Sequence, residues 1–243
     1  MIEALVVAGA LMGGFASGLT GFGFGLTSLP LWAHALAPST AAPLVIACSV
    51  AGQLQTLPKI WHAIDLRRLA PFVGFGVLGV PLGVMLLPRI PADAFRMGLG
   101  ALVVVACSVL LWLRITTRRE SSRTSDALVG FGGGVLGGIT GLMGVAPTIW
   151  AELHGWGKDE RRAIFQGYNL SILLVSLAGH LLVGTFTAAL VPLLLLAIPS
   201  AMAGAWLGRK LYDRVDAGRF SRIVLWLVWC AGLSLLGFGL LRG

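Results

Sequence analysis

The stretch GFASGLTGFGFGLTSLP, residues 14–30, decides how this chain folds. Four of the eight residues from Gly18 to Gly25 are glycines, set between large apolar side chains. Each glycine costs a helix about 1 kcal/mol relative to alanine, so a continuous helix gains nothing from this composition. Apolar sequence continues on both sides, from residue 2 to residue 37. We therefore expect one apolar segment that non-helical backbone interrupts.

The same pattern occurs a second time, 120 residues later. Residues 14–22 read GFASGLTGF, residues 134–142 read GVLGGITGL, and a proline follows each copy, at Pro30 and at Pro147. A repeat of this kind indicates that the second copy is also the interruption of an apolar segment, here residues 125–154.

A further match lies near the end of each half. GVPLG at residues 79–83 aligns with GAWLG at residues 204–208, an offset of 125. Two matched patches in the same order and at nearly equal offsets indicate an internal duplication. The halves are predicted to be residues 1–114 and 125–243, joined by a basic linker at residues 115–124.

The composition places the chain in a membrane. Of 243 residues, 57% are hydrophobic and only 12% are charged, with a mean hydropathy of +0.89. Soluble domains are about 45–50% apolar and about 25% charged, and a spanning helix needs roughly 20 apolar residues. The apolar segments are residues 2–37, 41–63, 69–88, 94–114, 125–154, 163–184, 188–209 and 219–241. We predict an all-α polytopic membrane protein.

Several function classes are not favoured. The net charge of +8 is divided among short clusters between apolar runs, as in cytoplasmic loops of membrane proteins, so we expect no nucleic-acid partner. Cys48, Cys107 and Cys230 each lie alone inside an apolar segment, and we expect neither a disulfide framework nor a metal site. The sequence has no HExxH, GxSxG or Walker motif, so we expect no enzyme, no cofactor and no ATP-driven transport.

The placement of charge predicts the topology. Three loops are basic, with Lys59, Arg67 and Arg68 in the first, Arg114, Arg118, Arg119 and Arg123 in the second, and Arg209, Lys210, Arg214, Arg219 and Arg222 in the third. The connections near residues 37–40 and 184–187 carry no charge. If every segment crossed, the second and third basic loops would lie on opposite faces, against the positive-inside rule.

The rule is satisfied if the segment at residues 125–154 enters the membrane and returns to the same side. Such a segment would consist of two half-helices and a turn, and the duplication implies the same for residues 2–37. Each half then crosses three times, which makes the halves inverted. We predict two inverted repeats, each with one broken, re-entrant helical hairpin plus three transmembrane helices. Arg89 and Arg96, on the outer side beside Asp93, are a weak exception to the rule.

The interruptions are candidates for a ligand site. Non-helical backbone at membrane depth is tolerated only where it is buried in protein or lines a cavity, and free amides at a helix N-terminus favour an anion. Thr20-Gly21 and Thr140-Gly141 occur identically in both copies, and we predict that they line the substrate site. For Gly14 and Gly18, and for their counterparts Gly134 and Gly138, close helix packing is the better interpretation.

A few polar side chains lie inside the predicted spans. Gln53 lies near Ser49, and Ser49 aligns with Asn169 at the offset of 120. Polar residues at such depth usually face the interior, where these three either donate to an anionic substrate or hydrogen-bond between helices. His180 either carries a proton or is simply hydrogen-bonded, and Lys59 either extends to the cytoplasmic surface or contacts the substrate.

The duplicated elements at residues 14–30 and 133–147 resemble those of the TauE/SafE family of sulfite exporters and related permeases. The later glycine pairs, the chain length and the layout in two halves fit that family as well. The resemblance implies transport of small anions across the bacterial inner membrane. Matched residue by residue, it would place Ser17, Thr20, Gly21 and Gly23 of the first copy and Thr140, Gly141 and Gly144 of the second copy at the substrate site. Phe22, Phe24 and Met143 depart from the family pattern and suggest a narrower, more apolar pocket.

We therefore expect a secondary transporter of a small anion, with sulfite or an organosulfonate as substrate. A permease for a carboxylate or another small anion is the alternative in the same scaffold, and a membrane scaffold subunit without transport is the alternative from another class. The expected partners are the anion and membrane lipid. A coupling proton or ion and a homodimer are partners that the sequence leaves open.

Overall fold

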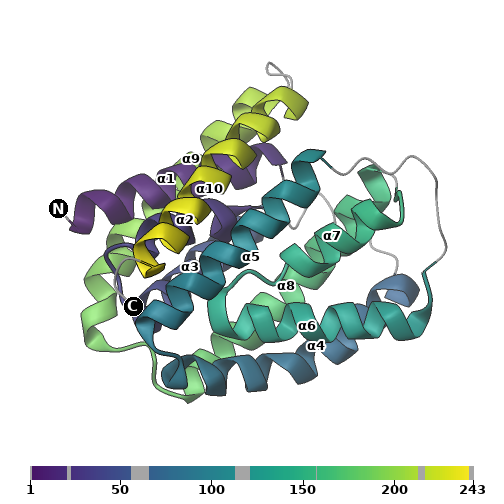
Figure 1. Cartoon of the computed structure of the whole chain (residues 1–243), viewed down its shortest axis with the longest axis horizontal. Helices are drawn as coiled ribbons and strands as arrows, with labels where there is room; N and C mark the ends of the chain where they lie inside the picture. Colours follow the sequence, from purple (N-terminus) through teal and green to yellow (C-terminus); the bar gives the residue numbers. More distant parts are fainter. Residues whose placement is uncertain are drawn as a thin grey trace.

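The computed structural model describes residues 2–20, 23–55, 66–112, 121–156, 158–212 and 217–240. Across these ranges the regular structure is helical, and the helices pack into one body (Figure 1). The first half contains α1 (Ile2–Thr20), α2 (Phe24–Ala33), α3 (Pro38–Leu54), α4 (Leu66–Leu86), the 3-10 turn η3 (Leu87–Arg89) and α5 (Ala92–Trp112). The second half contains α6 (Arg123–Thr140), α7 (Val145–Leu153), α8 (Lys158–Leu182), η4 (Ala188–Leu190), α9 (Val191–Tyr212) and α10 (Ala217–Leu240).

Both glycine-rich segments are broken, as predicted. The first resumes as α2 after Gly23, whose φ is 95°, and the second ends α6 at Gly141, whose φ is 75°. These left-handed conformations are open to glycine and end a helix sharply. The chain then folds back: Gly9 of α1 lies against Trp32, whereas Gly13, further along α1, lies against Phe24. The two helices of the break are therefore antiparallel neighbours.

The breaks are not central, which corrects the expectation that each broken segment consists of two half-helices and a turn. The first helix of each broken segment is long, with 19 residues in α1 and 18 in α6. The second helix is short, with 10 residues in α2 and 9 in α7. The reason is that the glycines which end α1 and α6 follow a full apolar run rather than half of one. At 1.5 Å per residue, each long helix covers most of a bilayer, whereas each short helix covers about half.

Glycines bring the long helices of one half against the other half. A Cβ atom at Gly14, Gly18, Gly134 or Gly138 would collide with the backbone of a facing helix, at Ala201, Ala205, Gly76 and Val80 respectively. The facing helices contribute glycines too, because Gly204 and Gly208 of α9 meet Leu11 and Phe15, and Gly79 and Gly83 of α4 meet Phe131 and Val135. The packing interpretation of these glycines is thus confirmed.

These contacts follow the duplication in the sequence. Helix α1 packs along α9, and α6 packs along α4, so the first helix of each half lies against the fourth helix of the other. Gly14 faces Ala201, and its counterpart Gly134 faces Gly76. The two facing residues, Ala201 and Gly76, are 125 positions apart, which is the offset between the matched patches at residues 79–83 and 204–208. Helices α5 and α10, which end the two halves, pack against each other.

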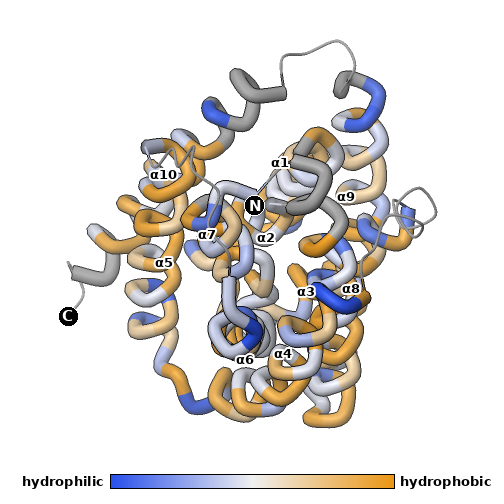
Figure 2. Tube along the Cα trace, turned by 90° about the vertical axis from the view of Figure 1, so that its right-hand side faces the viewer, coloured by the Kyte–Doolittle hydropathy of each residue, from blue (hydrophilic) through white to orange (hydrophobic). Residues whose placement is uncertain are grey.

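The outer surface is suited to lipid. Five helices in the described ranges are long and apolar enough to cross a membrane, beginning at Ile2, Leu66, Ala92, Ile164 and Ala188. Large apolar side chains face outward along them, for example Leu78 and Leu195, which are 64% and 70% exposed. Figure 2 shows apolar colour along the helices and polar colour mainly near their ends. Exposed apolar area on this scale marks a membrane surface, so the chain is an all-α polytopic membrane protein.

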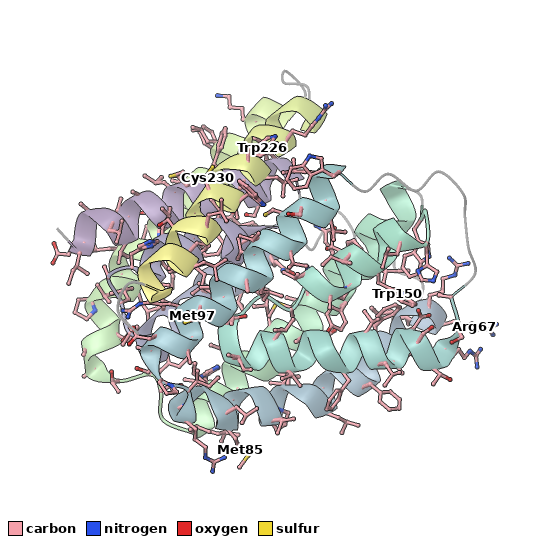
Figure 3. The ribbon with its side chains drawn as sticks, viewed as in Figure 1. Arg67, Met85, Met97, Trp150, Trp226 and Cys230 are labelled. Atoms are coloured by element: carbon pink, nitrogen blue, oxygen red, sulfur yellow. The ribbon has the colours of Figure 1, made fainter. Side chains whose placement is uncertain are left out.

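Tryptophans gather where α5 and α10 meet. The ring of Trp112 lies 5.4 Å from that of Trp226 and 6.0 Å from that of Trp229, in edge-to-face contacts. Trp226 and Cys230 both lie on α10 (Figure 3). Trp112 and Trp226 remain about half exposed, as the aromatic belt at a membrane interface requires.

Helix packing at α4 and α6 gives a stability prediction. Gly134→Ala places a methyl group against the Gly76 carbonyl, and we expect the free energy of unfolding to fall by about 1–3 kcal/mol, the usual cost of overpacking. Gly132→Ala, on the same helix, is the control, because nothing lies within 4 Å of its Cβ position. That variant should keep or raise stability, by up to about 1 kcal/mol. Thermal unfolding in detergent measures both, and equal stability of the two variants would contradict the packing described above.

Candidate substrate site between the two helix breaks

The two breaks meet at one cavity of about 70 Å³. Residues from both breaks, from the C-terminal parts of α1 and α3 and from the middle of α8 and α9 surround it: Ser17, Gly18, Gly23, Phe24, Gly25, Leu26, Cys48, Ser49, Gly52, Gln53, Gly141, Leu142, Met143, Gly144, Val145, Asn169, Leu173, Ala201 and Ala205. Both halves of the chain thus contribute matching elements to a single site.

The N-terminus of α2 forms one wall. Gly23 precedes the helix, and no side chain caps it. The first bond of the helical ladder runs from the Thr27 amide to the Gly23 carbonyl at 3.0 Å. The amides of residues 24–26 therefore precede the ladder, and all three residues line the cavity. An α-helix leaves such amides for an external acceptor.

The second break forms the opposite wall. The Gly141 amide donates to the Gly137 carbonyl at 2.9 Å, and the Leu142 amide donates to Thr140 Oγ1 at 3.1 Å. The Thr140 hydroxyl donates in turn to the Leu136 carbonyl at 2.7 Å. Thr140 is buried and does not line the cavity, so its hydroxyl holds the break in shape from behind.

Asn169 of α8 is the buried amide of the site. It is 5% exposed, and its Oδ1 atom has no hydrogen-bond partner among the described residues. The side chain lies against the second break, since a Cβ atom at Gly144 would be 2.9 Å from Oδ1. The amide can present either its oxygen or its NH₂ group to the cavity. An unpartnered amide at this depth costs free energy unless a ligand or water completes it.

The electrostatics of the cavity come from dipoles. Among the residues that the structure describes, none that lines the cavity is lysine, arginine, aspartate or glutamate. The two helix N-termini, at α2 and α7, point their partial positive charge at the same space. Ser49 and Gln53 of α3 add a hydroxyl and an amide, whereas the Ser17 hydroxyl donates to the Gly14 carbonyl at 3.0 Å. The site can therefore hold a small anion without a fixed positive charge.

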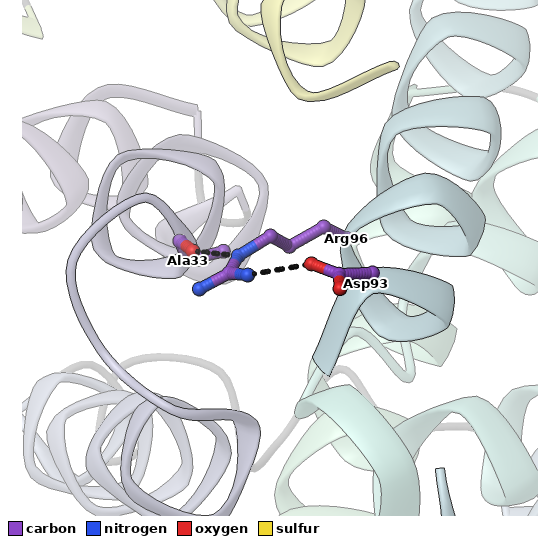
Figure 4. Close-up of polar contacts among 3 residues, drawn as sticks. All are labelled: Ala33, Asp93 and Arg96. Atoms are coloured by element: carbon purple, nitrogen blue, oxygen red, sulfur yellow. Dashed lines mark hydrogen bonds and ion pairs between the residues drawn. The ribbon is translucent and has the colours of Figure 1, made fainter. Parts of the chain in front are cut away.

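Helix α2 is fixed at its other end by Arg96 of α5. The guanidinium donates from Nε to the Ala33 carbonyl at 2.9 Å and from an Nη atom to Asp93 at 2.9 Å (Figure 4). A cation at the C-terminus of a helix complements its dipole. From the sequence we identified Arg96 only as an exception to the positive-inside rule. Nothing in the sequence indicates that α5 lies beside the end of α2.

The predicted site residues are distributed as follows. Ser17, Gly23, Ser49, Gln53, Gly141, Gly144 and Asn169 all line the cavity. Thr140 lies behind the second break. The side chain of Thr20, together with Gly21 and Lys59, lies outside the described residues. The predictions missed the amides at residues 24–26, although the glycines before them indicated where a helix would begin.

His180 is fully buried and hydrogen-bonded. Its Nε2 atom lies 2.8 Å from the Gly138 carbonyl, and its Nδ1 atom lies 3.0 Å from Thr185 Oγ1. Both ring nitrogens are thus hydrogen-bonded, as one of the two interpretations of this residue expects. Among the described residues there is also no group of three or more His, Cys, Asp and Glu side chains that could hold a metal ion.

Helix breaks that meet at a cavity inside an apolar bundle define a class of multi-pass membrane proteins in which substrates bind at unwound backbone. The comparison with protein families makes the assignment specific: residues 5–235 match the family "Sulfite exporter TauE/SafE". The chain belongs to this family of membrane transporters. Searches of curated proteins and of solved structures find no match.

The geometry of the second break gives a further stability prediction. Gly141→Ala forces a side chain into a left-handed conformation and against Val45, 2.8 Å from the new Cβ. Gly184→Ala is the matched control, because its φ is also 75° but nothing lies within 4 Å. We expect the control to lose about 1–2 kcal/mol from the backbone alone, and Gly141→Ala to lose about 1–3 kcal/mol more from overpacking. Thermal unfolding measures the difference, and equal losses would show that the break has room for a side chain.

Proposed function

We propose that this protein is a secondary transporter of a small anion, with sulfite or a small organosulfonate as substrate. The observation that carries the proposal is the convergence on one cavity of the uncapped N-terminus of α2, the second helix break at the start of α7, and the unpartnered Oδ1 atom of Asn169. Backbone amides at helix N-termini bind oxyanions. Membership in the TauE/SafE family of sulfite exporters supports the same substrate class.

The cavity volume limits the size of the anion. Pockets for drug-sized ligands measure roughly 300–1,000 Å³, whereas this cavity measures about 70 Å³. Phe24, Leu142 and Met143 line it. Phe24 and Met143 are two of the departures from the family pattern that suggested a narrower, more apolar pocket. Sulfite is the smallest anion of the proposed class and therefore the first substrate to test.

We further propose that residues 1–114 and 125–243 are inverted repeats in a bacterial inner membrane, joined by a cytoplasmic linker at residues 115–124. Two observations support the inversion. The exchanged packing of α1 on α9 and of α6 on α4 relates the halves as a two-fold axis would. The uncharged connections also come together, because Ser39 and Thr40 share a second cavity with Thr185 and Thr187.

Cysteine labelling in intact cells tests this topology. Thr187→Cys lies in the connection between α8 and α9, and Ser121→Cys lies just before α6. We expect a membrane-impermeant maleimide to label Thr187→Cys from outside and Ser121→Cys only after permeabilisation, because the basic loops are cytoplasmic. Both variants carry Cys230→Ser, which removes an exposed native thiol. Labelling of both positions from the same side would exclude the inverted arrangement.

Uptake into proteoliposomes tests the transport function. Radiolabelled sulfite should accumulate with the wild-type protein, and Asn169→Leu should lower the rate about tenfold, equivalent to about 1.4 kcal/mol of lost interaction with the anion. Ser171→Ala is the matched control on α8, because this hydroxyl only donates to the Gly167 carbonyl, one turn earlier. A sulfoacetate and a taurine arm separate sulfite from organosulfonates, and an acetate arm separates both from carboxylates. Wild-type protein that moves none of these anions would refute the proposal.

A further inference from the structure

Three buried polar side chains follow one face of α8. Asn169, Ser176 and His180 are separated by seven and four residues, which places them on the same side of a helix. Their exposed fractions are 5%, 0% and 0%. We call these three residues the polar face of α8. Such side chains in the middle of a bundle require partners.

Two members of this face lack such partners. Asn169 Oδ1 and Ser176 Oγ are buried and have no hydrogen-bond partner within the described ranges. A hydroxyl or an amide without a partner in apolar surroundings costs about 1–3 kcal/mol. A packed, purely structural core would favour apolar side chains at both positions. The polar atoms are better explained if water or a polar ligand reaches them in another state of the protein.

The face begins at one cavity and ends at another. Asn169 lines the substrate cavity, as does Leu173, one helical turn further on. At the other end His180 contacts Thr185 Oγ1 at 3.0 Å. Eleven residues separate Asn169 from His180, which is about 16 Å at 1.5 Å per residue.

Thr185 belongs to the second cavity, which measures about 150 Å³. This cavity lies between the connections α2–α3 and α8–α9, and four hydroxyl residues line it: Ser39, Thr40, Thr185 and Thr187, with Ala189 and Leu190 completing the wall. Under the proposed topology, both connections are on the outer side of the membrane. The polar face therefore leads from the substrate cavity toward the outside.

The closure of this route involves the second helix break. In an unbroken helix, the Leu142 amide would donate to the Gly138 carbonyl, but here it donates to Thr140 Oγ1. The Gly138 carbonyl bonds instead with His180 Nε2 at 2.8 Å. One imidazole thus joins the end of α6 to the wall of the outer cavity through Thr185. Leu173, which is fully buried, lies on α8 between the substrate cavity and this imidazole.

We propose that the polar face of α8 is the outer half of the anion's path, closed in this structure by Leu173 and His180. The inference rests on the proposed transport function and adds the route. Breaking the contact between His180 and Gly138 would separate α8 from the end of α6 and open Ser176 to water. In the sequence, Ser49 and Thr56 of the first half correspond to Asn169 and Ser176 at the offset of 120, and Thr56 lies outside the described residues.

Thiol accessibility tests the route without reference to any substrate. The background carries Cys48→Ala, Cys107→Ala and Cys230→Ser, which removes the native thiols. Ser176→Cys is compared with Ile172→Cys, a position one turn earlier that is equally buried but packs against Gly76 of α4 and Gly137 of α6 and does not line the substrate cavity. A membrane-impermeant, anionic methanethiosulfonate is added outside intact cells. We expect Ser176→Cys to react at least ten times faster than Ile172→Cys.

Equal rates at the two positions would overturn the proposal, whether both thiols are inert or both react. Size-exclusion chromatography verifies that each variant is folded. Thr185→Cys, at the outer end of the path, is the second variant, and its modification should block anion uptake. Rapid modification of Ser176→Cys in a protein whose wild type moves no tested anion would support the path and refute only the proposed substrate.

Discussion

The backbone carbonyls of α9 and α4 occupy the space that side chains of α1 and α6 would need. This close backbone contact sets the arrangement of both halves. Only glycine permits it at Gly14 and Gly134, because any Cβ would collide with the backbone of α9 or α4. The first helix of each half is consequently held by the other half. Neither half can bury its own first helix without its partner, so the site at their junction forms only when both are in place.

The close packing also explains why the helix breaks are where they are. Gly18 and Gly138, the last glycines of the packed rows, precede Gly23 and Gly141, where the backbone turns left-handed. Because α1 and α6 are packed along their length, their C-terminal ends lie at a defined depth in the membrane. The short helix that follows then starts at that depth, and the first residues of α2 and α7 line the same cavity. Packing glycines and site-forming glycines are thus consecutive parts of one element.

The sequence was sufficient for the features that depend on composition and repetition. Apolar runs identified the membrane segments. The repeated Thr-Gly, within glycine-rich stretches, identified both breaks, because so many glycines destabilise a continuous helix. The unequal helix lengths could not be predicted, since glycine marks where a helix ends but not how deep that point lies. Arg96 and His180 were missed or left open for a different reason: each acts on a carbonyl of another element, Ala33 or Gly138, which only tertiary packing brings near.

A site made of amide dipoles suits transport better than one made of cations. A lysine or arginine in a cavity of about 70 Å³ would attract an anion strongly and oppose its release. Conduction and transport require binding that is favourable enough to admit the substrate and weak enough to let it leave. In the proposed site, two helix N-termini and the amide of Asn169 would supply partial charges to an oxyanion without holding it as a full ion pair. Two arginines on the described helices contact other groups: Arg96 of α5 donates to the Ala33 carbonyl at the end of α2, and Arg209 of α9 donates to the backbone carbonyl and side-chain oxygen of Gln55.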